Sequence, residues 1–168
     1  MTKIRIETSE GIFTAWFSER GLAKLNFPPR PGHQAPPATP EACDWDPNLK
    51  PWISATREAI ETTLAGKTPN LLPPFDLSSG TEFQRQVWRA LRKIPSGKTM
   101  TYGQLAKLIG RPKAVRAVGQ ACGANSIPVL IPCHRVLAAN GGLGGFSAGL
   151  PWKRKLLEKE RVTPRTVG

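Results

Sequence analysis

"TYGQLAKLIGRPKAVRAVGQACG", residues 101–123, carries the clearest structural pattern in this sequence. Its first part begins with Thr101 and Gln104 at the spacing of a capping box and ends at a glycine, which predicts one short helix. The second part predicts another helix, with Pro112 at its first position and Gly123 just past its end. Two short helices joined by a tight turn are typical of a helix-turn-helix, although many such pairs serve only core packing.

The second of these helices has three distinct sides. The side chains expected in the core are Val115, Val118 and Cys122. An adjacent face is made of small side chains, namely Ala114, Ala117 and Ala121. Arg116 and Gln120 lie on the remaining side. A face of alanines beside one arginine favours close approach to the minor groove of DNA, with Arg116 entering the base stack. The same alanines are equally compatible with close helix packing alone.

Charge separates the chain into two unequal halves. Residues 1–77 contain 8 basic and 9 acidic side chains, whereas residues 78–168 contain 16 basic and 3 acidic ones. The basic half therefore holds the whole of the net charge of +12. Solubility charge would tend to spread along the chain, so this asymmetry indicates contact with a polyanion, most simply nucleic acid.

The nearly neutral first half is predicted to form a small sheet with one helix. Residues 3–7 and 12–27 alternate apolar and polar side chains, with a hairpin turn near 18–21. A proline-rich loop over 28–40 follows, then a helix over 49–66 and a second proline-rich connector. We therefore expect an α/β (α+β) protein with domains at 1–77 and 78–168, the second helical and winged-helix-like.

The chemistry is expected in "IPVLIPCHRV", residues 127–136. An apolar run bounded by prolines predicts a short buried strand, with Cys133 at its end. Neighbours in an extended chain point apart, so we expect Cys133 and His134 to cooperate through a water molecule. Glu160 shares the apolar side of a last helix that begins at Pro151, and a buried carboxylate needs a His or Arg partner. Cys133, His134 and Glu160 thus form a candidate nucleophile, base and orienting carboxylate.

Other candidate features have simpler explanations. We expect Cys43 and Cys122 to be buried small side chains and His33 to be exposed. The cysteines and histidines show no paired metal-ligand spacing, so we expect no metal site. "GGLGGFSAG" lacks the features of phosphate-binding and dinucleotide-binding loops and reads as a flexible turn or as a pocket wall lined by backbone.

The pattern "IPCHRV" at 131–136 resembles the active-site signature of the O6-alkylguanine-DNA alkyltransferases, also called methylated-DNA–protein-cysteine methyltransferases. The resemblance covers residues 79–161 densely, including the helical pair and "GGLGGFSAGL". It extends only loosely to the N-terminal half, where the family has an RNase H-like domain. It implies irreversible, single-turnover transfer of an alkyl group from O6-alkylguanine in DNA to a cysteine, after the damaged nucleotide is flipped out of the duplex.

The resemblance also implies roles for individual residues. Cys133 matches the alkyl acceptor, His134 the base that acts through water, Glu160 the carboxylate that orients it, and Tyr102 the donor to guanine N3. Arg116 matches the side chain that fills the gap left by the flipped base. The other residues expected at the DNA surface are Ala114, Ala117, Ala121, Gln120, Thr101 and Arg135. Those expected around the substrate are Asn125, which braces the active-site turn, and Val136, Phe146, Ser147 and Ala148.

The sequence departs from the family pattern in the substrate loop. Phe146 replaces a common tyrosine, and Ala148 replaces a common glycine, so we expect a narrower pocket. Gly123 stands where some relatives have a basic side chain.

The chemistry implied by the resemblance requires no cofactor, and the expected partner is double-stranded DNA contacted by a monomer through the minor groove. We expect no membrane association, because no apolar run could span a bilayer and no signal peptide is evident.

Rival functions remain to be separated. An alkyltransferase-like protein binds damaged DNA without catalysis, but such proteins lack the acceptor cysteine that this chain has at Cys133. A fused transcriptional regulator would need a further domain, and a Cys-His hydrolase is disfavoured because Cys133 and His134 are adjacent. With free thiols and no secretion signal, we expect a cytoplasmic location, at the nucleoid in a prokaryote or in the nucleus of a eukaryote.

Overall fold

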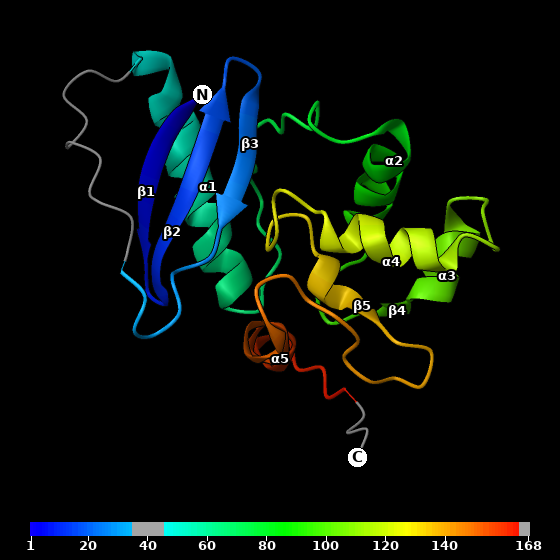
Figure 1. The fold of residues 1–168 in the computed structure, drawn as a ribbon. Coiled ribbons are helices and arrows are strands. Elements are labelled where there is room, and N and C mark those ends of the chain that lie inside the picture. Colours follow the sequence, from blue (N-terminus) through cyan, green and yellow to red (C-terminus); the bar gives the residue numbers. More distant parts are fainter. Residues whose placement is uncertain (35–45, 165–168) are drawn as a thin grey trace.

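A three-stranded antiparallel sheet and one long helix form the N-terminal half of the chain. The computed structural model describes residues 1–34 and 46–164 (Figure 1). The strands are β1 (Thr2–Thr8), β2 (Gly11–Ser18) and β3 (Gly21–Asn26), in the order β1-β2-β3. Helix α1 (Lys50–Leu64) packs against one face of this sheet. The hairpin predicted within residues 12–27 and the predicted helix are therefore confirmed.

Side-chain alternation explains the orientation of the sheet. Ile4 and Ile6 of β1 and Phe13 of β2 are buried in the core. On the outer face, Lys3 and Lys24 place their ammonium groups 5.9 and 5.0 Å from the ring centroid of Trp16. Because successive side chains of a strand point to opposite faces, one apolar face packs against α1 while the other meets solvent.

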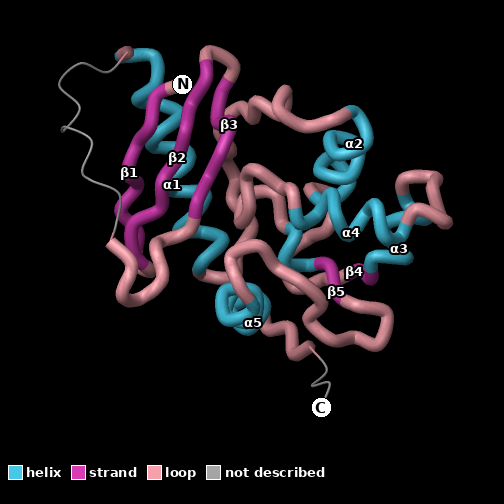
Figure 2. Tube along the Cα trace, in the orientation of Figure 1, coloured by secondary structure: helices cyan, strands magenta, loops and turns pink. Residues whose placement is uncertain are grey.

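The regular structure of the C-terminal half is mainly helical, with long loops between the helices (Figure 2). Its α-helices are α2 (Glu82–Leu91), α3 (Tyr102–Leu108), α4 (Val115–Gly123) and α5 (Leu150–Lys159). The short elements are the 3-10 helices η1 (Pro47–Leu49), which precedes α1, and η2 (Cys133–Arg135), and the strands β4 (Met100–Thr101) and β5 (Val136–Leu137). The pairing of β4 with β5 is parallel and brings the start of α3 beside the segment that follows η2. The predicted mixed α/β class is confirmed.

Helix α3 begins as predicted, but α4 does not. The side chain of Thr101 accepts a hydrogen bond from the backbone N–H of Gln104 at 3.1 Å, and the Gln104 side chain accepts from the Thr101 N–H at 2.8 Å. The prediction that the next helix starts at Pro112 is wrong, because α4 begins at Val115. A turn closed by Ala114 N–H on the Arg111 carbonyl, 2.9 Å, occupies those positions instead.

The two halves pack together through one continuous core. Buried residues of the sheet, α1, α2, α4 and α5 belong to a single hydrophobic cluster. At its edge, Gly66 has φ +76°, and a Cβ there would lie 1.9 Å from the Lys159 carbonyl oxygen. Only glycine allows this approach of the end of α1 to the end of α5. The division at 77/78 stays a prediction.

The connectors agree with the sequence where the structure describes them. Residues 27–34 form a loop, with His33 exposed as predicted, and the remainder of the 28–40 loop and Cys43 lie outside the described residues.

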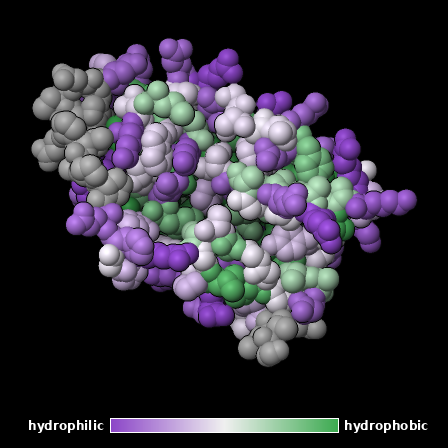
Figure 3. Space-filling view, in the orientation of Figure 1, coloured by the Kyte–Doolittle hydropathy of each residue, from purple (hydrophilic) through white to green (hydrophobic). Residues whose placement is uncertain are grey.

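Hydrophilic side chains surround the rim of the face seen in Figure 3, with apolar side chains visible toward its middle. Among the described residues, no helix combines the length and apolar character needed to cross a membrane.

Candidate active site

The segment before Cys133 is a series of turns, so the predicted strand over 127–132 is wrong. Pro128 and Pro132 lack the N–H groups that a strand would use in pairing. Val129 adopts φ 74°, a left-handed conformation that β-branched residues rarely take. Cys133 therefore follows a strained turn and begins the 3-10 helix η2, rather than ending a strand.

Asn125 holds this turn in place through both ends of its side-chain amide. Its Nδ2 donates to the carbonyl of Ile131 at 2.8 Å, and its Oδ1 accepts from the N–H of Ile127 at 3.0 Å. Asn125 is itself buried. Both bonds span the turn that leads to Cys133, so this side chain holds that turn, in agreement with the role that the family resemblance implies for it.

A buried cluster of three side chains joins η2 to the end of α5. Oε1 of Glu160 lies 3.0 Å from Nε2 of His134 and 2.7 Å from Nη2 of Arg135. Nη1 of Arg135 also donates to the Ile94 carbonyl at 2.6 Å. The predicted burial of Glu160 and its need for a His or Arg partner are confirmed, and it has both.

The assignment of Arg135 to the DNA surface is wrong. Its side chain is only 8% exposed and is committed to Glu160 and to the Ile94 carbonyl. Sequence reasoning missed this because the two partners are distant along the chain. The adjacent charge of Arg135 serves to neutralise Glu160 inside the fold, where an unpaired carboxylate would be costly.

The ionisation of the cluster fixes the tautomer of His134. Burial alone would raise the pKa of Glu160, but the hydrogen bonds from His134 and Arg135 hold it at about 2. An ionised carboxylate can only accept hydrogen bonds, so Nε2 of His134 carries the proton. Burial lowers the pKa of His134, which keeps the ring neutral. Its Nδ1 is then a free acceptor, and it has no hydrogen-bond partner among the described residues.

Cys133 is a protonated thiol in the resting protein. It is 5% exposed, and burial raises its pKa, opposed in part by a hydrogen bond with Asn125 and by the nearby Lys153 ammonium. A thiol in this state is a weak nucleophile until a base removes its proton. The unpartnered Nδ1 of His134, the next residue, is a base of the required kind. Cys122 is also buried, as predicted.

Lys153 is a site residue that the sequence reasoning missed. It is fully buried, and its Nζ donates to the carbonyls of Val136 at 2.6 Å and Gly145 at 3.0 Å. Burial lowers its pKa to about 8. One ammonium thus ties the segment after η2 to the glycine-rich loop. A signal was present, because Lys153 and Glu160 share one helical face at i, i+7 spacing.

Tyr102 is placed beside the glycine-rich loop by its position at the start of α3. A Cβ on Gly144, which has φ +68°, would lie 3.1 Å from the Tyr102 hydroxyl oxygen. The loop can pass this close to the phenol only because that residue is glycine. Tyr102 is partly buried, and burial raises its pKa, so the hydroxyl keeps its proton at neutral pH.

Helix α4 presents only part of the predicted surface. Arg116 and Gln120 are exposed, and Ala114 and Ala117 are partly exposed. The assignment of Ala121 to this surface is wrong, because it is buried and its carbonyl accepts from Trp88 Nε1 at 2.8 Å. The prediction that Val115 is in the core is also wrong, since it is 41% exposed in the first turn of the helix.

Three of the predicted substrate-pocket residues line one cavity. Asn125, Ser147 and Ala148 face a space of about 390 Å³ that is also bounded by Phe27 and Arg30 of the N-terminal half. Sequence reasoning did not find these two N-terminal residues, because nothing local links the loop after β3 to the glycine-rich loop. Of the other two predicted residues, only Phe146 contacts a side chain that lines this cavity. Val136 is fully buried, and the Phe146 ring packs edge-on against Phe27 at 5.7 Å.

No metal cluster is formed by the residues that the structure describes. No group of three or more His, Cys, Asp or Glu side chains in residues 1–34 and 46–164 could hold an ion. The charged and titratable side chains that the structure brings together are Glu160, His134 and Arg135, and Cys133 is the residue before His134. The cluster is therefore suited to a nucleophilic reaction at sulfur, driven by a base that a carboxylate orients.

The sequence of the chain is similar to those of known DNA methyltransferase proteins. The family described as 6-O-methylguanine DNA methyltransferase, DNA binding domain, matches residues 82–162. The chain is 40% identical over 158 residues to the methylated-DNA–protein-cysteine methyltransferase of Methanosarcina barkeri, covering 92% of this chain and 94% of that one. It is 51% identical over 104 residues to the bifunctional transcriptional activator/DNA repair enzyme Ada of Escherichia coli, covering 62% of this chain but 29% of Ada.

The structure of the chain is also similar to that of a solved relative. The structure of Mycobacterium tuberculosis OGT in complex with DNA superposes with a TM-score of 0.73 at 35% identity, covering 94% of this chain and 91% of that one. This match includes the N-terminal sheet as well as the helical half, and the Methanosarcina barkeri relative matches over nearly its whole length. The chain therefore belongs to the methylated-DNA–protein-cysteine methyltransferase family.

Proposed function

We propose that this protein repairs DNA by moving the alkyl group of O6-alkylguanine irreversibly to the sulfur of Cys133. The observation that carries the proposal is the state of His134. Glu160 fixes the proton on Nε2, which leaves Nδ1 as an unpartnered base beside a buried thiol. Membership in the family supplies the substrate class, and the side chains of this chain supply the chemistry.

The reaction balances with the residues present. His134 Nδ1 takes the Cys133 proton through a bridging water, and the thiolate attacks the alkyl carbon. The S–C bond forms as the C–O6 bond breaks, and its electron pair returns to the guanine ring. Tyr102 donates a proton to guanine N3 as the base leaves, which is general acid catalysis. The thioether product has no return path, so each molecule reacts once.

DNA is engaged through α4 and the start of α3. The exposed Arg116 and Gln120, with the small side chains Ala114 and Ala117, suit close approach to the minor groove, and Arg116 would fill the gap left by the flipped nucleotide. Thr101 caps α3 beside this surface. The proposal includes the helix-turn-helix role of α3 and α4 and binding as a monomer. The strongly basic second half would attract the duplex.

Intact-protein mass spectrometry after mixing with an O6-methylguanine duplex tests the proposal. The wild type is expected to gain one methyl group, and Cys133→Ala none. Cys122→Ala is the matched control, because it removes another buried thiol and should still gain one methyl. Tight binding to the damaged duplex without any mass gain would instead identify a non-catalytic binder of alkylated DNA.

A further inference from the structure

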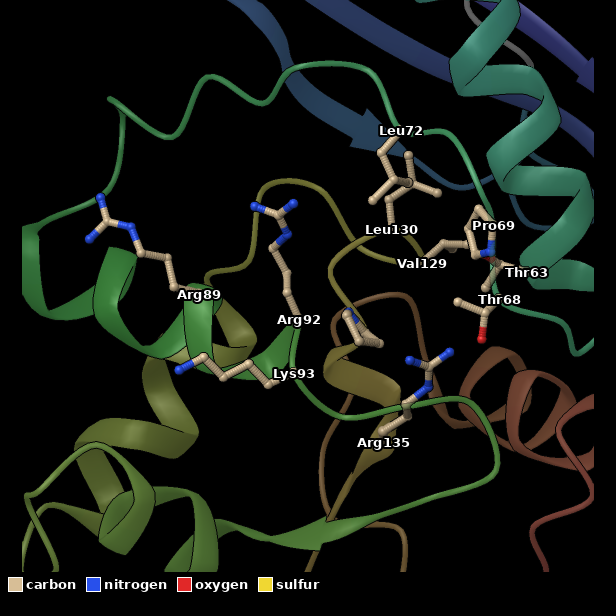
Figure 4. A pocket seen from close by; sticks show the side chains of 11 residues that line it. Thr63, Thr68, Pro69, Leu72, Arg89, Arg92, Lys93, Val129, Leu130 and Arg135 are labelled. Atoms are coloured by element: carbon tan, nitrogen blue, oxygen red, sulfur yellow. The ribbon is translucent and has the colours of Figure 1, made fainter.

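A second cavity lies behind the reactive segment. It has a volume of about 250 Å³ and is lined by α2, the connector after α1, the turn before Cys133, and Arg135 (Figure 4). None of its lining residues lines the cavity that contains Ser147 and Ala148. It is smaller than the ~300–1,000 Å³ usual for drug-sized ligands, so an occupant would be small or would enter only in part.

The lining is cationic and contains no carboxylate. Arg89, Arg92 and Lys93 leave the last turn of α2 and the residues just beyond it, and Arg135 enters from η2 (Figure 4). Within the described residues, Arg135 alone among these four has a carboxylate within salt-bridge distance. The side chains of Arg89, Arg92 and Lys93 are exposed and point in different directions (Figure 4). With no carboxylate paired to them among the described residues, they give this side of the cavity a net positive charge that would attract an anion.

Two of the cations are held in position. The Arg92 guanidinium lies 4.8 Å from the centroid of the Phe75 ring, where cation–π attraction orients it. Arg135 is fixed by Glu160 and the Ile94 carbonyl. An arginine has five N–H groups, so these bonds leave hydrogens on its terminal nitrogens available. The side chain of Thr68 adds a hydroxyl to the lining.

The wall between these cations is rigid. Val129 lines the cavity in its left-handed conformation, and the Ile131 N–H closes that turn on the Ile127 carbonyl at 2.9 Å. Backbone strain of this kind persists only where the surrounding structure over-determines it, and it clusters at ligand sites. A rigid wall between fixed arginines reduces the conformational entropy that binding would cost.

We propose that this cavity is a phosphate-binding site, separate from the alkyl-transfer site. Arginine recognises phosphate oxygens through paired N–H donors, and lysine adds a point charge. The phosphate could belong to a free ion such as inorganic pyrophosphate or to the backbone of DNA. In either case it would lie behind Cys133, since Pro132 and Arg135 form part of the wall.

Isothermal titration of unreacted protein with pyrophosphate at low salt tests the site. The wild type is expected to bind one equivalent saturably, and Arg92→Gln/Lys93→Gln at least ten-fold more weakly. The control Lys98→Gln/Lys159→Gln removes two exposed charges outside the cavity and should bind like the wild type. Absence of saturable binding, or equal weakening in the control, would overturn the proposal. Methyl transfer does not enter this test, so it is independent of the proposed repair activity.

A second arm identifies the source of the phosphate. Binding of an unmodified duplex is measured against salt for the same proteins. If the site holds backbone phosphates, the cavity variant loses duplex affinity, its salt slope falls by about 2 relative to the wild type, and pyrophosphate competes with DNA. If the site holds a free phosphate, duplex binding of the cavity variant equals that of the control. Either result supports a phosphate site, provided that the calorimetric arm shows binding.

Discussion

Nε2 of His134 lies 3.0 Å from Oε1 of Glu160, with both side chains fully buried. The same carboxylate binds Arg135, so one group neutralises a cation and orients a base. This double role explains why a charge is retained in the core. In the proposed mechanism, Glu160 therefore links the stability of the fold to the reactivity of Cys133.

Glu160→Gln is expected to destabilise the fold strongly. The change leaves the buried Arg135 without its counterion, and breaking a buried pair typically costs about 3–5 kcal/mol of unfolding free energy. Chemical denaturation measures this directly. Glu158→Gln, two residues earlier and exposed, is the control and should change stability by less than about 0.5 kcal/mol. Similar losses in the two variants would contradict the buried-pair interpretation.

Acid is expected to destabilise the protein in two stages. Below about pH 6.5 the unfolded chain protonates His134 while the folded state resists, because burial lowers that pKa, so stability falls. Glu160 has its pKa lowered from 4.5 to about 2, so its contribution is complete above pH 4.5 and is lost as the pH falls toward 2. That second loss is about 3 kcal/mol.

Urea denaturation from pH 7.5 to pH 3 separates the two stages. His134→Gln should flatten the part of the curve just below pH 6.5 and leave the lower part. His33→Gln, which alters an exposed loop residue, should keep both stages. A wild-type stability that does not change between pH 7 and pH 5 would show that His134 titrates as it does in the unfolded chain.

Local patterns in the sequence predicted local structure well. The capping box of Thr101 and Gln104 and the buried side of Glu160 both follow from helix geometry within a few residues, and both are present. The strand predicted over 127–132 was wrong, because a short apolar run bounded by prolines does not by itself specify an extended conformation. Its conformation depends on the side chain of Asn125, which no periodicity reveals.

Contacts between residues far apart in the chain determine which predicted surface residues are in fact buried, and local sequence patterns do not reveal these contacts. Arg135 follows the reactive pair, so a surface role was a natural interpretation, but its partners are Glu160 and the Ile94 carbonyl, 25 and 41 residues away. Ala121 fits a small exposed face by spacing, yet it is buried, and its carbonyl accepts a hydrogen bond from Trp88 of α2. In both cases tertiary packing selects one of several faces that the local pattern allows.

Lys153→Met is expected to slow alkyl transfer while leaving DNA binding intact. It removes the two hydrogen bonds that tie Val136 and Gly145 together, so the glycine-rich loop is no longer held beside Tyr102. Each charged hydrogen bond is worth about 1.5–3 kcal/mol, so stability should fall as well. Rapid-quench kinetics on an O6-methylguanine duplex measures the rate. Lys159→Met, on the exposed side of α5, should react like the wild type.

Ala148→Gly is expected to speed the reaction with free O6-benzylguanine. Ala148 lines the same cavity as Asn125 and Ser147, and removing its methyl group gives a bulky alkyl substituent more room. The effect should be larger for benzyl than for methyl, because a methyl group already fits. Pseudo-first-order labelling rates with the two substrates give the ratio. Ala139→Gly, exposed and outside that cavity, controls for added loop flexibility. Equal benzyl rates in the wild type and Ala148→Gly would show that this side chain does not limit the pocket.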